Sequence, residues 1–269
     1  MRMRRTPSLL LAAAALLTVA GPARAGRLRD LCPDRPGLGT PACTMDPGHV
    51  MVELGLGDWS LTRQGGERED DLSTGDLLVR YGLGSSLELQ LGWTAYSHVR
   101  TRSGTTVAHR SGAGDLFVAL RRNLSNPDGS GFSAALMPYA TLPTGRDGIG
   151  AGDWGAGLLV PMSYRLDRLV TLDLTAEADA AVDADGHGRH FAYSAIAGVD
   201  LNLTDRIGAA AELEVARDED PAGHATQALA GLSLDWSPND DVQFDVGTNV
   251  GLNREAPDVE VYFGVARRF

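Results

Sequence analysis

Near its end the chain reads Val259-Glu260-Val261-Tyr262-Phe263-Gly264-Val265. Valine and phenylalanine occupy every second position, and the positions between them hold Glu260, Tyr262 and Gly264. A two-residue period places alternate side chains on opposite faces of a strand, so that an apolar row can face lipid while the other row faces a polar interior. One such strand also fits a soluble sandwich. A membrane barrel needs many of them, so the rest of the chain decides the fold.

The same alternation recurs in twelve segments after His49. The clearest are residues 87–93, 170–176 and 193–203. Most segments are close to the length that a tilted strand needs to cross the hydrocarbon layer, about 10 residues. The sequence therefore predicts an all-β fold, a transmembrane antiparallel β-barrel of about 12 strands over residues 49–269.

The connections between these segments alternate in length. Tight turns such as Gly84-Ser85-Ser86 and Thr204-Asp205-Arg206 follow the even-numbered segments. Longer and more charged stretches follow most odd-numbered segments, for example 63–75 and 100–113. Short periplasmic turns that alternate with longer outer loops are typical of bacterial barrels. We therefore expect a Gram-negative outer-membrane protein with both termini in the periplasm.

Two prolines fall inside predicted strands. Pro138 and Pro161 each lack the N–H that a ladder hydrogen bond needs, and a closed barrel has no free edge to accommodate them. We expect a bulge or a kink at these positions, or strands that are shorter than the pattern suggests.

The N-terminus has the features of a secretory signal. Arg2, Arg4 and Arg5 precede an apolar stretch over residues 9–20, and Ala23-Arg24-Ala25 forms a small-residue cleavage site. Residues 1–25 are predicted to be a signal peptide, and residues 26–48 a periplasmic segment before the barrel. Cleavage removes four of the 24 basic residues, which leaves a net charge of about −15 against 35 acidic residues. This acidity excludes nucleic acid as a partner.

Cys32 and Cys43 are the two cysteines of the chain. In an exported protein two close cysteines are expected to form a disulfide. A metal or redox role is disfavoured because the spacing is not Cys-x-x-Cys. We predict no cofactor and no metal site.

The polar rows of the predicted strands define a lumen rich in carboxylates. We expect these carboxylates to favour cationic or neutral solutes over anions. The alternative is that acidic and Arg side chains merely brace and fill a narrow barrel. The predicted lumen-lining residues are Glu88, Asp173, Glu177, Asp179, Glu212, Glu214 and Asp245, with Arg80 and Arg121 as the accompanying cations.

Two groups of residues suggest enzymatic alternatives. His109-Arg110-Ser111 has the spacing of an outer-membrane phospholipase pair, but it lies in a charged stretch that we expect to be a loop. Carboxylates and histidines around 183–190 could imitate an omptin-type protease, but Asp-Ala-Asp-Gly is ordinary turn chemistry. These residues are Asp183, Asp185, His187 and His190. We therefore predict that the chain is not an enzyme.

Several short motifs resemble a known family. Cys32-Pro33-Asp34-Arg35-Pro36 and Pro41-Ala42-Cys43-Thr44 are followed by Gly114-Asp115-Leu116 and Leu142-Pro143-Thr144-Gly145. In this order they resemble the transporter-like proteins of the meta-pathway of phenol degradation, over essentially the whole mature chain. The resemblance implies an outer-membrane transporter, in some members linked to uptake of aromatic or hydrophobic compounds. It implies no binding residues.

These observations lead to one main hypothesis and one alternative. The main hypothesis is a porin-like channel or transporter for passive uptake of a small-molecule solute. The alternative is a closed structural or adhesion barrel that acts through its outer loops. In either case the expected partners are membrane lipids and the barrel assembly machinery. The machinery would recognise the C-terminal strand, which ends at Phe269.

Overall fold

The structure is a computed structural model that describes residues 28–269. The signal peptide predicted for residues 1–25 lies outside the described residues. No helix in the described part is long and apolar enough to span a membrane. The strands are β1 (Val50–Gln64), β2 (Glu67–Gly84), β3 (Leu87–Ser103), β4 (Thr106–Gly112), β5 (Leu116–Ser125), β6 (Phe132–Leu142), β7 (Gly155–Arg165), β8 (Val170–Val182), β9 (Arg189–Asn202), β10 (Ile207–Asp218), β11 (Ala225–Asn239), β12 (Val242–Gly251) and β13 (Val259–Arg268).

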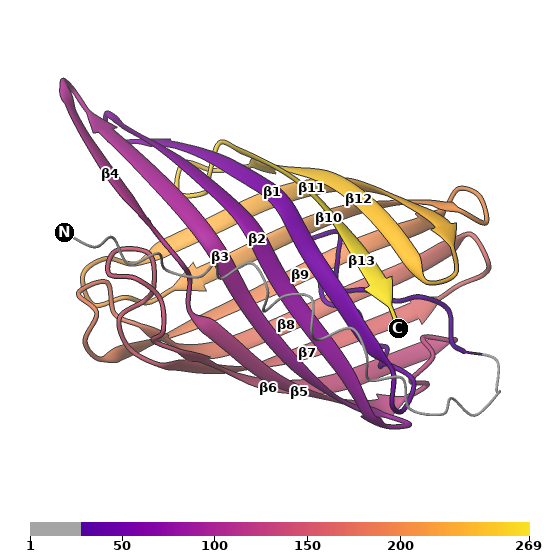
Figure 1. The fold of residues 1–269 in the computed structure, drawn as a ribbon. Coiled ribbons are helices and arrows are strands. Elements are labelled where there is room, and N and C mark those ends of the chain that lie inside the picture. Colours follow the sequence, from indigo (N-terminus) through magenta and orange to yellow (C-terminus); the bar gives the residue numbers. More distant parts are fainter. Residues whose placement is uncertain (1–27) are drawn as a thin grey trace, which may run out of the picture.

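The strands form a single closed antiparallel sheet (Figure 1). β1 pairs with β13 on one side and with β2 on the other, and the pairing of β2 with β3 completes the ring. β4 and β5 both pair with β3, the first with its second half and the second with its first half. They therefore act as one interrupted strand, and the wall is a twelve-stranded barrel. The predicted fold class is confirmed.

Both described ends of the chain lie at the same end of the barrel, which we call the terminal end. There the backbones of Val50 and Phe269 exchange hydrogen bonds of 2.8 and 3.2 Å. The connections at the terminal end are residues 85–86, 126–131, 166–169, 203–206 and 240–241, and those at the opposite, far end are 65–66, 104–105, 143–154, 183–188, 219–224 and 252–258.

Two predicted loops are wrong. Residues 63–75 and 100–113 belong almost entirely to strands, which continue to two-residue turns, and the β3–β4 hairpin projects beyond the far end (Figure 1). Charged side chains do not interrupt these strands, because beyond the lipid they pair across the ladder. For example, the Thr101 hydroxyl donates to Glu69 at 2.9 Å. The charged residues therefore indicate where the apolar outer surface ends, and the strands continue beyond that level.

The wall is apolar outside and polar inside. Leu213 and Leu232 on the outer face are 57% and 63% exposed, whereas Glu53, Arg80 and Glu88 on the inner face are fully buried. In a water-soluble protein this arrangement would be unfavourable. In a bilayer the exposed leucines meet hydrocarbon, and the closed ladder satisfies the backbone groups.

The prolines cause no bulge. Around Pro138 the β5–β6 ladder lacks some pairs but keeps one register from Leu116 to Asn123, and the β6–β7 ladder passes Pro161 in the same way. The expected distortion is therefore absent from both ladders around these prolines. Each strand tolerates the missing donor because the regular pairs on either side hold its register.

Candidate functional site

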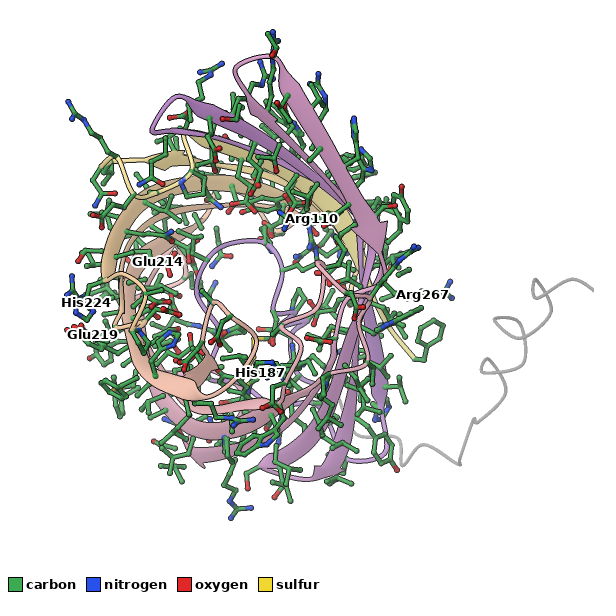
Figure 2. The ribbon with its side chains drawn as sticks, turned by 90° about the vertical axis from the view of Figure 1, so that its left-hand side faces the viewer. Arg110, His187, Glu214, Glu219, His224 and Arg267 are labelled. Atoms are coloured by element: carbon green, nitrogen blue, oxygen red, sulfur yellow. A yellow bond between two sulfur atoms is a disulfide. The ribbon has the colours of Figure 1, made fainter. Side chains whose placement is uncertain are left out.

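Residues 28–48 enter the barrel at its terminal end and lie within the ring of strands (Figure 2). We call them the plug segment. At its deepest part, the Gly37 N–H donates to the Tyr262 hydroxyl of β13 at 3.1 Å, and the Leu38 and Gly39 N–H groups donate to Glu212 of β10 at 2.7 and 2.9 Å. Thr40 bonds to Thr175 of β8. The plug segment thus reaches several parts of the wall.

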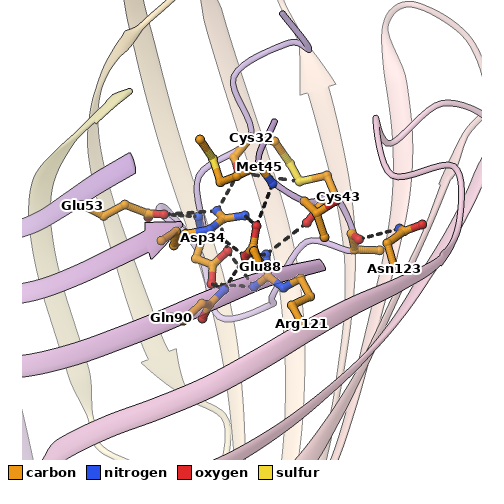
Figure 3. Close-up of polar contacts among 12 residues, drawn as sticks. Cys32, Asp34, Cys43, Met45, Glu53, Glu88, Gln90, Arg121 and Asn123 are labelled. Atoms are coloured by element: carbon orange, nitrogen blue, oxygen red, sulfur yellow. Dashed lines mark hydrogen bonds and ion pairs between the residues drawn. A yellow bond between two sulfur atoms is a disulfide. The ribbon is translucent and has the colours of Figure 1, made fainter. Parts of the chain in front are cut away.

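An ion-pair cluster holds the first half of the plug segment against β1, β2, β3 and β5 (Figure 3). Asp34 accepts hydrogen bonds of 2.7 and 2.8 Å from the Arg121 guanidinium, and it lies 2.8 Å from Arg80. Arg80 also contacts Glu53 at 3.2 Å and Glu88 at 3.0 Å. We call these five residues the arginine–carboxylate cluster. Its two arginines and two wall glutamates are fully buried.

The plug backbone completes the hydrogen bonding of this cluster. The carbonyl oxygens of Cys32 and Cys43 accept from Arg80 and Arg121 at 2.7 and 3.2 Å. Glu88 accepts from the Met45 N–H at 2.7 Å. Buried charges are tolerated when they are both paired and hydrogen-bonded. The wall charges of the cluster therefore depend on the plug segment for part of their solvation.

The disulfide between Cys32 and Cys43 closes a loop that contains Asp34. The predicted pairing of the two cysteines is thus present in the structure. Because the loop is closed, the carbonyls of both cysteines and the Asp34 carboxylate are presented together to the two arginines. A closed loop also has fewer conformations to lose when it docks.

Burial by itself raises the pKa of the Asp34 carboxyl. The facing guanidinium groups of Arg121 and Arg80 outweigh this effect and hold the pKa of Asp34 below its ordinary value. Asp34 is therefore a carboxylate at neutral pH, and it can act as the anionic link between two wall arginines.

A second anchor lies next to the first. Arg35 donates to Asp245 of β12 at 3.0 and 3.3 Å, and its guanidinium lies over the Tyr262 ring at 5.6 Å from the centroid. The Gln243 side chain donates to the Arg35 carbonyl at 2.8 Å. Asp34 and Arg35 thus fix adjacent residues of the plug segment to opposite charges on the wall.

The wall formed by β8–β11 is only partly covered by the plug segment. A cavity of about 200 Å³, which we call the terminal-side cavity, lies between plug residues 31–41 and the inner faces of β8–β11. A second, far-side cavity of about 240 Å³ is lined by Glu177, Asp179 and Glu214. The Tyr139 hydroxyl lies within hydrogen-bond distance of Glu177 and of Asp179, so that its single proton is shared between these two carboxylates.

The predicted lumen residues divide into two groups. One group contacts the plug segment and consists of Arg80, Glu88, Arg121, Glu212 and Asp245. The other group lines the cavities and consists of Asp173, Glu177, Asp179 and Glu214. Their role in selectivity stays a prediction. Three further residues bear on the site without having been predicted: Glu53, which shares the inward row of β1 with Met51, and the plug residues Asp34 and Arg35.

Two family-like motifs far apart in the sequence meet at the far end. The Asp115 carboxylate accepts from the N–H groups of Gly145 and Ala151 at 2.7 and 2.8 Å. The Thr144 hydroxyl accepts from the Leu116 N–H at 2.9 Å. These contacts fold the loop 143–154 against the point where β4 and β5 separate. The motifs around Asp115 and Thr144 therefore hold a loop in place.

The residues behind the two enzymatic alternatives lie in different parts of the far half of the barrel. His109 and Ser111 lie on strand β4 and not in the predicted loop, and no hydrogen bond joins them in the described chain. His190 lies 2.9 Å from Asp183 and 2.9 Å from Asp218, which links the far-end loops 183–188 and 219–224. Asp185 instead accepts from the His187 N–H within its own turn.

A family model described as "Putative MetA-pathway of phenol degradation" matches residues 34–269. The chain belongs to this family. The match begins at Asp34 and so includes most of the plug segment. A comparison with curated proteins gives no significant match.

Solved structures with a similar fold are outer-membrane barrels. The translocator domain of the autotransporter NalP from Neisseria meningitidis is 16% identical, with a TM-score of 0.51, over 82% of this chain and 88% of that chain. The KdgM porin is 11% identical, with a TM-score of 0.48, over 81% of this chain and 99% of that chain. The barrel thus resembles those of bacterial outer-membrane proteins.

Proposed function

We propose that this chain is an outer-membrane channel for passive uptake of small molecules, and that solutes pass along the β8–β11 wall. The observation that carries the proposal is the pair of cavities at two depths on this one wall. The plug segment bonds to this wall at Glu212 and Thr175, but its ion pairs with the barrel lie on other strands. Polar, carboxylate-lined cavities suit hydrated solutes.

The charge of the route limits the solute. Carboxylates line both cavities, and charged rings in a pore repel ions of the same sign. The route therefore disfavours anions and admits neutral or cationic solutes. The family description names phenol degradation, and a neutral aromatic solute is compatible with this lining.

The orientation follows from the same proposal. The terminal end would face the periplasm and the far-end loops the exterior, with lipids around the apolar outer face. The C-terminal strand ending at Phe269 would engage the assembly machinery during insertion. Protease added to intact cells should cut in the far-end loops and leave both termini uncut; cleavage at the termini would reverse the orientation.

Reconstitution tests the channel directly. Refolded mature protein in planar bilayers should show ion conductance, and proteoliposomes should swell in small neutral solutes. A gel-mobility shift on boiling verifies that the barrel has folded. Folded protein that neither conducts nor admits any small solute contradicts the proposal.

One observation favours a second candidate, a closed structural barrel. The plug segment is held by buried ion pairs and by a disulfide, as expected for a permanent closure. A variant that lacks residues 26–48 distinguishes the channel from the closed structural barrel. If the intact protein is closed and the truncated one conducts, the plug segment is a seal; if both conduct, solutes pass beside it.

A further inference from the structure

The terminal-side cavity exists because β10 has small residues on its inner face. Gly208 lies in register with Asp235 of β11, and Ala210 lies between Ser233 of β11 and Asp200 of β9. Glycine and alanine leave the wall recessed between longer neighbours. The plug segment spans this recess from Leu31 to Pro41 and converts it into a cavity of about 200 Å³.

The charges around the cavity are unbalanced. Asp173, Asp200 and Asp235 line it, and no arginine or histidine of residues 28–269 forms a salt bridge with any of them. Arg35 borders the cavity but its guanidinium is bound to Asp245. Carboxylates in a partly desolvated recess are stabilised when a cation joins them.

An independent observation also points to a ligand. Ser233 is only 6% exposed and lines the cavity, and its hydroxyl has no hydrogen-bond partner among the described residues. Buried hydroxyl groups in native proteins are nearly always hydrogen-bonded. A bound polar group in the cavity would satisfy Ser233.

The spread of the carboxylates favours an organic cation over a metal ion. In the described chain one group of acidic and histidine side chains converges closely enough to hold a metal, and it is Asp183, His190 and Asp220 at the far end. The three cavity aspartates therefore do not all converge on one point; Asp173 and Asp200 lie together, and Asp235 lies apart from them. The cavity is also smaller than the roughly 300–1,000 Å³ of typical drug-sized pockets. Its dimensions suit a small solute with one or two charged groups.

We propose that the terminal-side cavity binds a small organic cation that carries ammonium or guanidinium groups, held by Asp173, Asp200 and Asp235 with Ser233 as a neutral hydrogen-bond partner. The proposal rests on the channel function given above and names the solute class that the route selects. The ammonium donors would each meet a carboxylate, and the apolar linker would lie along Ala210 and the plug segment.

Calorimetric titration of folded, detergent-solubilised mature protein tests the site. The probe is 1,4-diaminobutane, and 1,4-butanediol is the neutral probe of equal length. We expect saturable binding of the diamine and none of the diol. The triple variant Asp173→Asn, Asp200→Asn, Asp235→Asn should weaken binding about tenfold or more. Ser233→Ala should weaken it by a smaller factor with the barrel unchanged.

The control variant is Asp58→Asn, which removes an inward carboxylate of β1 outside this cavity. It should leave diamine affinity unchanged. An equal loss in Asp58→Asn and in the triple variant would show that the diamine senses only the general lumen potential, and would overturn the site. No binding by the folded wild-type protein would overturn it as well.

Liposome swelling separates this proposal from the channel itself. Wild-type proteoliposomes that admit the diol and the diamine at equal rates would sustain the channel and refute the cation preference. Diamine binding in the calorimeter without any swelling would sustain the site and refute the channel. Faster entry of the diamine, lost in the triple variant, supports both.

Discussion

The two walls of the lumen use carboxylates in opposite ways. On β1, β2, β3 and β5 every buried glutamate faces an arginine or a plug N–H, as Glu53 and Glu88 do around Arg80. On β8–β11 no arginine of residues 28–269 forms a salt bridge with an inward carboxylate, and the terminal-side and far-side cavities lie beside these strands. A further cavity on the opposite wall is lined by Asp58 and Asp76. The plug segment forms its ion pairs with β2, β5 and β12, and it bonds to β8 and β10 through backbone N–H groups. The carboxylates of β8–β11 are not neutralised by arginine, so they can interact with a solute that passes through the lumen.

The largest effect is expected from Arg80→Ala. This change leaves Asp34, Glu53 and Glu88 facing one another without their shared cation. Breaking a buried ion pair from one side costs about 3–5 kcal/mol. Urea unfolding of the refolded barrel should show a loss of this size. The control Arg122→Ala, at an exposed position of β5, should stay close to the wild type. Equal losses in the two variants would mean that the cluster does not contribute specifically to stability.

A smaller effect is expected when the disulfide is removed. The double variant Cys32→Ser, Cys43→Ser frees the loop that presents Asp34, at a cost of about 3 kcal/mol in the chain-entropy model. Because the wall ladder is untouched, we expect the plug segment to loosen and the barrel to stay folded. Limited proteolysis should cut within residues 28–48 of the variant first. If the variant resists protease as the wild type does, the ion pairs alone hold the plug segment.

Acid should release the same segment. The pKa of Asp34 lies below its ordinary value, so its pairing is fully present above about pH 3.9 and is lost as the pH falls through the lower folded value. Protease sensitivity of residues 28–48 should therefore rise as the pH is lowered below the ordinary pKa of an aspartate, measured with an acid-active protease. In the Asp34→Asn variant, residues 28–48 should be sensitive to protease already at pH 7. The control Asp205→Asn, in an exposed turn, should behave as the wild type does.

The smallest effect concerns the wall formed by β8–β11. Neutralising Glu177 and Asp179 to Gln and Asn removes two carboxylates from the far-side cavity. Conductance and cation preference in planar bilayers should both fall, with little change in stability because no ion pair is broken. The reversal potential in a salt gradient measures this. An unchanged potential would place the route elsewhere in the lumen.

The alternation of side chains determined the twelve-stranded barrel. Each strand faces lipid on one side, and this places apolar residues at every second position, a pattern that is visible in the local sequence. It also put Glu88, Glu212 and Arg121 in the polar row. It misjudged the far-end hairpins, since charge there marks the water boundary and does not end the ladder.

Only the tertiary structure decided which inward charges are paired. Asp34 lies 87 residues from Arg121 in the sequence, and Arg35 lies 210 residues from Asp245. No local pattern joins such partners, because they meet only after the sheet has closed and the plug segment has entered it. The sequence thus specified a barrel with a charged interior, and closure of the ring divided that interior into a wall whose glutamates pair with arginine and a wall whose carboxylates do not.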